Sequence, residues 1–238
     1  MELFTQEGVY FLLRWLHFLA GIVWIGLLYY FNFVQTPFFA TAEAPVRSGM
    51  IRGLVPSALW WFRWGAMITF LSGWAYIGMK MGLEKVPHGS AYMTLIMTGG
   101  LLGTVMWANV WFVIWPNQKV VIANANQTAT GGQPIPDAAN RGKRAGLASR
   151  TNTALSIPML FFMGAASHLQ SLGDKLARGE GMIGAHYGVL LLVIVAMEFN
   201  ALSGLDQPRQ KILSTVKGAI TLGFILSAVM YFSCEVFI

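Results

Sequence analysis

Residues 12–26 read LLRWLHFLAGIVWIG, an apolar run that contains an arginine, Arg14, and a histidine, His17. Apolar residues continue on both sides, so the run is long enough to cross a bilayer, which takes about 20 residues of helix. An ionisable side chain is costly in hydrocarbon and therefore normally faces the interior of a helical bundle, where it marks a function. The stretch predicts a membrane helix with a functional group inside it.

The composition extends this prediction to the whole chain. Of the 238 residues, 55% are hydrophobic and only 11% are charged, a balance outside the range of soluble globular domains. We expect an all-α, polytopic membrane bundle of about six transmembrane helices, forming a single integral-membrane domain over residues 1–238. The first helix lacks a small-residue cleavage site and is expected to be retained. The expected spans are 9–33, 58–79, 92–115, 153–171, 183–202 and 216–237.

The basic residues predict the orientation of these helices. The formal net charge is +6, and eleven of the sixteen Lys and Arg residues fall around the first, third and fifth connections. By the positive-inside rule, these connections are cytoplasmic and both termini lie outside. The basic excess therefore indicates topology, and no nucleic-acid partner is expected.

Residues 117–151 form the longest connection in this pattern. Their centre, NANQTATGGQPIPD (124–137), is polar and contains Gly and Pro, which is typical of a flexible linker. We predict a cytoplasmic linker loop at 117–151. The single cysteine of this sequence, Cys234, excludes an internal disulfide and the CxxCH motif that attaches a c-type haem, so no covalent c-type haem is expected on the chain.

Two histidines are expected at similar depth near the outer face. His17 lies about eight residues, or roughly 12 Å, inside the inward-running first helix, and His168 lies near the outer end of the fourth. A b-type haem needs axial nitrogens that approach the iron from opposite faces inside a bundle. We predict His17 and His168 as metal ligands of a non-covalent haem b, with His186 in reserve.

The neighbours of these histidines fit the same prediction. Gly21 and Gly164 each lie one helical turn deeper than their histidine, where they leave clearance for a flat macrocycle. Arg14 lies one turn nearer the outer surface and could pair with a haem propionate. Each feature also has a packing explanation, because Gly serves helix contacts and Arg extends to lipid headgroups.

A second polar set is expected toward the cytoplasmic face: Arg63, Asn109, Glu198 and Asn32. A carboxylate at this depth must be protonated, paired or in contact with water. Arg63 is the expected partner of Glu198. We predict Glu198, Arg63 and Asn109 as candidate catalytic residues that contact a substrate or a proton, with a structural ion pair as the alternative.

Four segments carry a family resemblance: LLRWLHFLAGIVWIG, WWFRWGAMITFLSGWA (60–75), WPNQK (115–119) and GKRAGLASRTNTALSIPMLFFMGAASH (142–168). They resemble the N-terminal membrane domain of the bacterial urate hydroxylases, the membrane-bound urate oxidases, which also carry a C-terminal cytochrome c domain. The resemblance implies a multi-pass protein of the bacterial inner membrane in which His17 and His168 match family histidines. The cytochrome domain is not found in this sequence.

A further departure is the segment VAMEFNA (195–201), where relatives tend to have an Arg-His pair before Phe-Asn, so that Glu198 replaces a basic residue. Three functions stay open. The first is a haem-b-bearing redox subunit that passes electrons toward an outer-face acceptor, with other membrane subunits as partners. The second is a urate hydroxylase-type oxidoreductase that uses a separate cytochrome c, and the third is a cofactor-free structural subunit.

Overall fold

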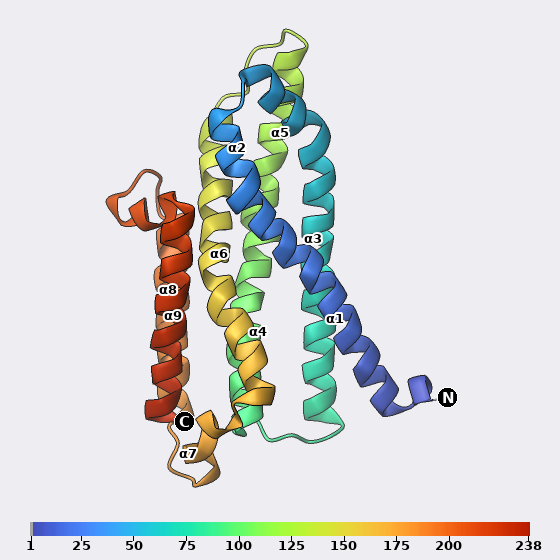
Figure 1. The fold of residues 1–238 in the computed structure, drawn as a ribbon, viewed down its shortest axis with the longest axis vertical. Helices are drawn as coiled ribbons and strands as arrows, with labels where there is room; N and C mark the ends of the chain where they lie inside the picture. Colours follow the sequence, from blue (N-terminus) through green and yellow to red (C-terminus); the bar gives the residue numbers. More distant parts are fainter. Residues whose placement is uncertain (1) are drawn as a thin grey trace.

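The computed structural model describes residues 2–238, which fold into an elongated bundle of long helices (Figure 1). Each span expected from the sequence overlaps a helical segment, but α3 and α6 begin well before the expected spans 58–79 and 153–171. The long elements are α1 (Gln6–Tyr29), α3 (Ala44–Gly82), α4 (Ala91–Ala108), α5 (Trp115–Ala129), α6 (Ala138–His168), α8 (Ile183–Leu202) and α9 (Val216–Phe237). The short elements are η1 (Glu2–Phe4), η2 (Tyr30–Gln35), α2 (Thr36–Thr41), η3 (Asn109–Ile114), η4 (Gln170–Gly173), α7 (Asp174–Ala177) and η5 (Pro208–Ser214).

Two of the long helical segments contain a π-helix. η2 joins α1 to α2, and η3 joins α4 to α5, without a break in the helical path. Each π-helix ends two residues before a proline, Pro37 or Pro116. Proline lacks a backbone N–H and crowds the carbonyl four residues earlier, and the wider π turn accommodates that crowding. The π turns also reorient the side chains that they carry, among them Asn32 and Asn109.

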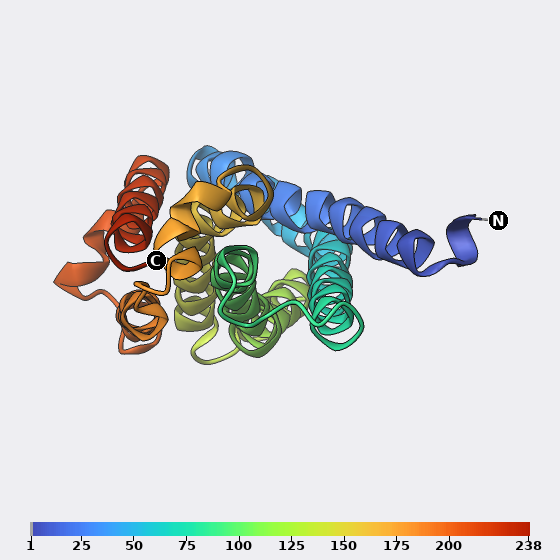
Figure 2. The same cartoon turned by 90° about the horizontal axis from the view of Figure 1, so that it is seen from below.

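The helices pack as three neighbouring antiparallel groups with α6 at the centre (Figures 1 and 2). α1 lies along α3, α4 lies along α6, and α8 and α9 form a pair that meets α6 on its other side. Small residues allow the close approach: a Cβ on Gly223 of α9 would lie 2.7 Å from the carbonyl oxygen of Ala154, and one on Gly99 of α4 would lie 3.1 Å from that of Met159. α6 therefore touches both α4 and α9 almost backbone to backbone.

The length and apolarity of the helices make this a multi-pass membrane protein in a lipid bilayer. Within residues 2–238, four helical segments are long and apolar enough to cross a membrane. They are Gln6–Thr41, Ala91–Ala129, Ile183–Leu202 and Val216–Phe237. A fifth is added if α6 and the following segment 171–177 form one bent span. The count of six spans and the outward position of both termini stay predictions.

The expected flexible linker at 117–151 differs from the structure. α5 continues to Ala129 and α6 begins at Ala138, so only residues 130–137 are not helical. Two hydrogen bonds hold this region together: Ile135 N–H of the turn donates to Asn124 Oδ1 of α5 at 2.7 Å, and Arg141 Nη1 of α6 donates to Asn117 Oδ1 of α5 at 3.4 Å. The polar composition of this segment reflects helices that extend beyond the apolar part of the bundle, and only the Gly and Pro residues mark the turn.

Candidate functional site

The alternating direction of the helices brings the four histidine-bearing segments to one end of the bundle. The first half of α1, the connection 83–90, the C-terminal end of α6 and the start of α8 all lie toward the lower end in Figure 1. His17, His88, His168 and His186 belong to these segments in that order. We call this end of the molecule the histidine end.

His17 is half-buried against α3, and its ring is oriented by Ser72. The Ser72 hydroxyl donates its single hydrogen to the Ile68 carbonyl at 2.7 Å, and it lies 3.3 Å from His17 Nδ1. Its lone pair can therefore accept a hydrogen from Nδ1, and in that tautomer the lone pair of the ring is on His17 Nε2. A hydrogen bond at one ring nitrogen that fixes the tautomer is typical of metal-ligating histidines.

Glycine at position 73 makes room for this ring. A Cβ on Gly73 would lie 2.9 Å from His17 Cε1, closer than such atoms approach in proteins. A residue larger than glycine at position 73 would therefore displace the imidazole. Gly21, the predicted clearance residue on α1, faces Thr69 of α3, whose Cγ2 lies 3.9 Å from the position of an added Cβ.

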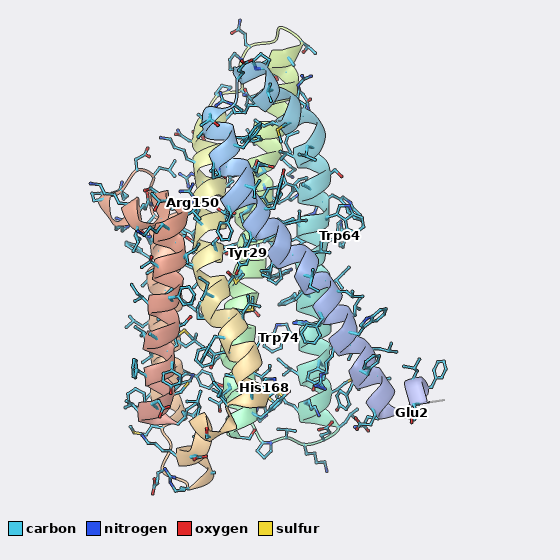
Figure 3. All side chains as sticks on the ribbon, in the orientation of Figure 1. Glu2, Tyr29, Trp64, Trp74, Arg150 and His168 are labelled. Atoms are coloured by element: carbon cyan, nitrogen blue, oxygen red, sulfur yellow. The ribbon has the colours of Figure 1, made fainter. Side chains whose placement is uncertain are left out.

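His168 is the last residue of α6 and is exposed at its end (Figure 3). Gly164, one turn earlier, is also exposed, and an added Cβ there would meet no atom within 4 Å. Within residues 2–238, no hydrogen bond links His168 to His17. The structure therefore leaves His168 and the space over Gly164 accessible, and the pairing of the two histidines on one iron stays a prediction.

Arg14 lies beside tyrosine, not beside a carboxylate. Its guanidinium is 5.6 Å from the centre of the Tyr76 ring, a cation–π distance. No ion pair in the described chain includes Arg14. Nearby, Lys80 Nζ lies 2.6 Å from Glu84 Oε2, and this hydrogen bond lowers the pKa of the Glu84 carboxyl. The guanidinium thus has no carboxylate partner among the described residues.

His186, the reserve ligand of the sequence analysis, has a different role. Its Nε2 lies 2.9 Å from Thr98 Oγ1, and its Nδ1 lies 2.9 Å from Ser233 Oγ. The Thr98 hydroxyl donates to the Thr94 carbonyl, so it accepts a hydrogen bond from His186 Nε2. The Ser233 hydroxyl then donates to His186 Nδ1. With both nitrogens hydrogen-bonded and only 1% of the residue exposed, His186 has no nitrogen available for iron. It joins α8 to α4 and α9 instead.

The second polar set centres on Asn109 in the π-helix η3. Asn109 Nδ2 donates to Glu198 Oε1 at 2.8 Å and to Asn152 Oδ1 at 2.9 Å. Asn152 Nδ2 in turn donates to the Met106 carbonyl at 2.9 Å. The chain of amides connects α8, η3 and α6. The sequence analysis missed Asn152, although a fully buried polar residue inside a helix of small residues is a signal for such a contact.

Arg63 does not pair with Glu198, which corrects the sequence analysis. Its guanidinium lies 4.0 Å from the Trp115 ring centre and 5.1 Å from that of Trp111. α3 and α8 lie on opposite sides of α4 and α6 in both views (Figures 1 and 2), so the two side chains cannot meet. Positive-inside topology gives the depth of a residue but not the order of helices around the bundle.

The Glu198 carboxyl therefore has neutral neighbours. It is half-buried, it accepts from an amide, and no ion pair of residues 2–238 contains it. A carboxyl without a cation can exist in either protonation state, as proton-transfer groups do. The described residues contain no group of three or more His, Cys, Asp or Glu side chains that could hold a metal ion. A haem with two axial histidines has only two protein ligands, so it does not require a group of three such side chains.

Comparison with known proteins gives one family. A family model described as "Urate oxidase N-terminal" matches residues 76–177. The matched segment runs from the last turns of α3 through α4, η3, α5 and α6 to α7, so it includes Asn109, Asn152, Gly164 and His168. No curated protein and no solved structure gives a significant match to the chain.

We predict that His186→Phe destabilises the bundle. The substitution leaves the Ser233 hydroxyl, and the lone pair of Thr98, without partners, and an unsatisfied buried group costs about 1–3 kcal/mol. The thermal midpoint of the purified protein in detergent should fall by several degrees. The matched control is His88→Phe, because His88 is an exposed loop residue. An equal effect of both substitutions would contradict the role assigned to His186.

Proposed function

We propose that the chain is the membrane subunit of an oxidoreductase, on the basis of the match between residues 76–177 and the urate oxidase N-terminal family model. The histidine end holds a b-type haem and passes electrons toward an acceptor at the outer face. The observation that carries this proposal is the 3.3 Å contact between His17 Nδ1 and the Ser72 hydroxyl, together with the absence of any hydrogen bond to His17 Nε2 in the described chain. In the tautomer in which Nδ1 carries the hydrogen, the Nε2 lone pair is available to iron.

The residues of the histidine end fit such a group. The lone pair of His17 Nε2 is the donor that haem iron takes. His168 is exposed on the same end of the molecule, and the absence of a Cβ at Gly164 leaves open space one turn from it. Arg14 keeps guanidinium donors for a propionate carboxylate. When bound, the haem would supply a one-electron carrier, and the protein would contribute ligation, orientation and charge.

A second candidate function is urate hydroxylation with a separate cytochrome c as electron acceptor. It is supported by the family match, which covers Asn109 and Asn152 of the amide chain. Addition of a hydroxyl group from water to the purine ring releases two electrons and two protons. The Glu198 carboxyl, with amide neighbours only, is able to accept one of these protons, and two molecules of a c-type cytochrome would take the electrons.

We predict that His17→Ala abolishes haem retention. The substitution removes the nitrogen ligand, whereas His88→Ala changes only an exposed loop residue and should leave the haem content intact. Ser72→Ala frees the ring of His17, and loss of such an orienting hydrogen bond typically costs about 10- to 100-fold in affinity. The pyridine haemochrome spectrum of each purified variant measures the outcome.

Two results would overturn this proposal. A wild-type protein that folds in the membrane without haem supports the cofactor-free structural subunit. A His17→Ala variant with full haem content places the ligand elsewhere. The thermal midpoint of every variant must be measured in parallel, so that loss of the cofactor is separated from loss of the fold.

We predict that urate reduces the chromophore of the wild-type protein, and that Glu198→Gln slows this reduction by 10-fold or more. Glutamine keeps the acceptor oxygen for Asn109 but cannot take up a proton, and general-base catalysis typically contributes about 10²- to 10⁴-fold. Stopped-flow absorbance with urate as reductant measures the rate. A haem-containing protein that dithionite reduces and urate does not would exclude urate hydroxylation and leave the electron-carrying subunit.

A further inference from the structure

A cavity of about 540 Å³ lies at the end of the bundle opposite the histidines. Its walls come from η2 and α3 on one side and from α6, η5 and the segment 205–207 on the other. These segments lie toward the upper part of Figure 1, around the positions of Arg150 and the short helix η5 in Figure 3. Small-molecule sites in proteins typically have volumes of about 300–1,000 Å³. We call this space the basic cavity because most of the charged residues that line it are cationic.

The charged residues that line the cavity are mainly cationic. The lining contains three cations, Lys143, Arg150 and Lys211, and one carboxylate, that of Asp206. Lys143 Nζ pairs with Asp206 at 2.7 Å, and no ion pair within residues 2–238 involves Arg150 or Lys211. The balance is therefore positive, and a negative ligand is the charge that this space favours.

Arg150 is the best placed of these cations. It is half-buried, and its Nη1 donates to the carbonyls of Leu213, at 2.9 Å, and Ser214. These contacts fix the planar guanidinium against η5 and leave the donors on Nε and Nη2 without a hydrogen-bond partner among the described residues. A fixed guanidinium with unused donors is suited to a planar anion such as a carboxylate or an enolate.

The remaining walls suit a flat ring. Phe31 and Phe62 meet edge to face with ring centres 5.4 Å apart, and both line the cavity together with Leu59 and Ile114. Polar side chains complete the walls, namely Asn32, Gln118, Ser149 and Gln210. An apolar and aromatic floor with a few amides is typical of sites that bind heteroaromatic ligands. An acyl chain or a bare phosphate would leave these amides unused.

The cavity is also close to the half-buried carboxyl of Glu198. Ser149 lines it and accepts a hydrogen bond from Asn32 Nδ2 at 2.8 Å. Asn152, which carries the amide chain to Asn109 and Glu198, follows three residues later on the same face of α6, or roughly 4.5 Å along the axis. A ligand in the basic cavity would therefore lie about one helical turn from the residues that reach Glu198.

We propose that the basic cavity binds a small organic anion with a flat conjugated ring, held by Arg150 and Lys211 and packed on Phe31. The anion site rests on the cavity itself, and only the choice of urate as the first probe rests on the proposed function. The site lies at the other end of the bundle from the predicted haem, so occupancy can be measured without any redox reaction.

The test is calorimetric titration of urate into the full chain in phosphatidylcholine nanodiscs. Arg150→Gln should weaken binding by about tenfold or more, because a hydrogen bond to a charged group contributes about 1.5–3 kcal/mol. Lys211→Gln should weaken it severalfold. Lys217→Gln is the matched control, since Lys217 is equally exposed but does not line the cavity, and it should leave the affinity unchanged.

A second variant guards against misfolding of Arg150→Gln, which also loses two carbonyl contacts. Gly146 lines the cavity, and a Cβ there would meet no atom within 4 Å, so Gly146→Trp should fit sterically and block the site. Gly53→Trp is its control, because Gly53 of α3 also has open space around an added Cβ and does not line the cavity. Binding of urate should be lost in the first variant and kept in the second, with both thermal midpoints near that of the wild type.

Three outcomes would overturn the proposal: no binding of urate, full affinity in both Arg150→Gln and Gly146→Trp, or loss of binding when anionic phosphatidylglycerol is added, which would mark a lipid headgroup site.

Failure of the proposed function gives results that differ from failure of the anion site. A haem-free protein that binds urate with these variant effects retains the anion site and loses the redox role. A haem protein that urate reduces equally fast in Gly146→Trp retains the redox role and loses this site.

Discussion

The hydrogen bond between the side chains of Asn109 and Asn152 ties α4 and, through Glu198, α8 to the central helix α6. A buried amide in a membrane protein must find partners inside the protein, because lipid offers none. Asn152 is fully buried on α6, and its partners are the side chain of Asn109 and the Met106 carbonyl. Asn109 then reaches Glu198 on α8. The rotation of α4, α6 and α8 about their axes is thereby fixed by groups that cannot be satisfied in any other register.

This constraint works only because α6 is a helix of small residues. Ala145, Ala148 and Ala154 are fully buried, and glycines of α4 and α9 pack directly on the α6 backbone. Close approach brings short amide side chains into contact across the helix interface. The same helix carries Ser149 at the basic cavity and His168 at the histidine end. α6 is thus the element that links the two ends, and its position decides what each end can bind.

Much of the fold could be predicted from the sequence, and less of the site. Apolar runs locate the helices because span length is set by the bilayer, and alternating direction brings His17 and His168 to one end. The order of helices around the bundle is not encoded in hydropathy, so Arg63 was matched with Glu198 although α4 and α6 separate them.

Two other errors have local causes. The segment 117–151 is polar because its helices extend beyond the apolar part of the bundle, and polarity alone does not distinguish such a helix from a loop. The role of His186 depends on Thr98 and Ser233, which come from two other helices and have no signature in the sequence around it. The tautomer of His17 likewise depends on Ser72, a residue 55 positions away.

The central claim is that His17 of α1 and His168 of α6 bind one haem from opposite faces. Electron paramagnetic resonance of the oxidised protein tests it directly, because two strong axial nitrogens give low-spin ferric iron and one gives high-spin iron. The account predicts a low-spin signal in the wild type that becomes high-spin in His168→Ala while haem is retained. A low-spin signal that persists in His168→Ala, or a wild-type signal that is already high-spin, would contradict it.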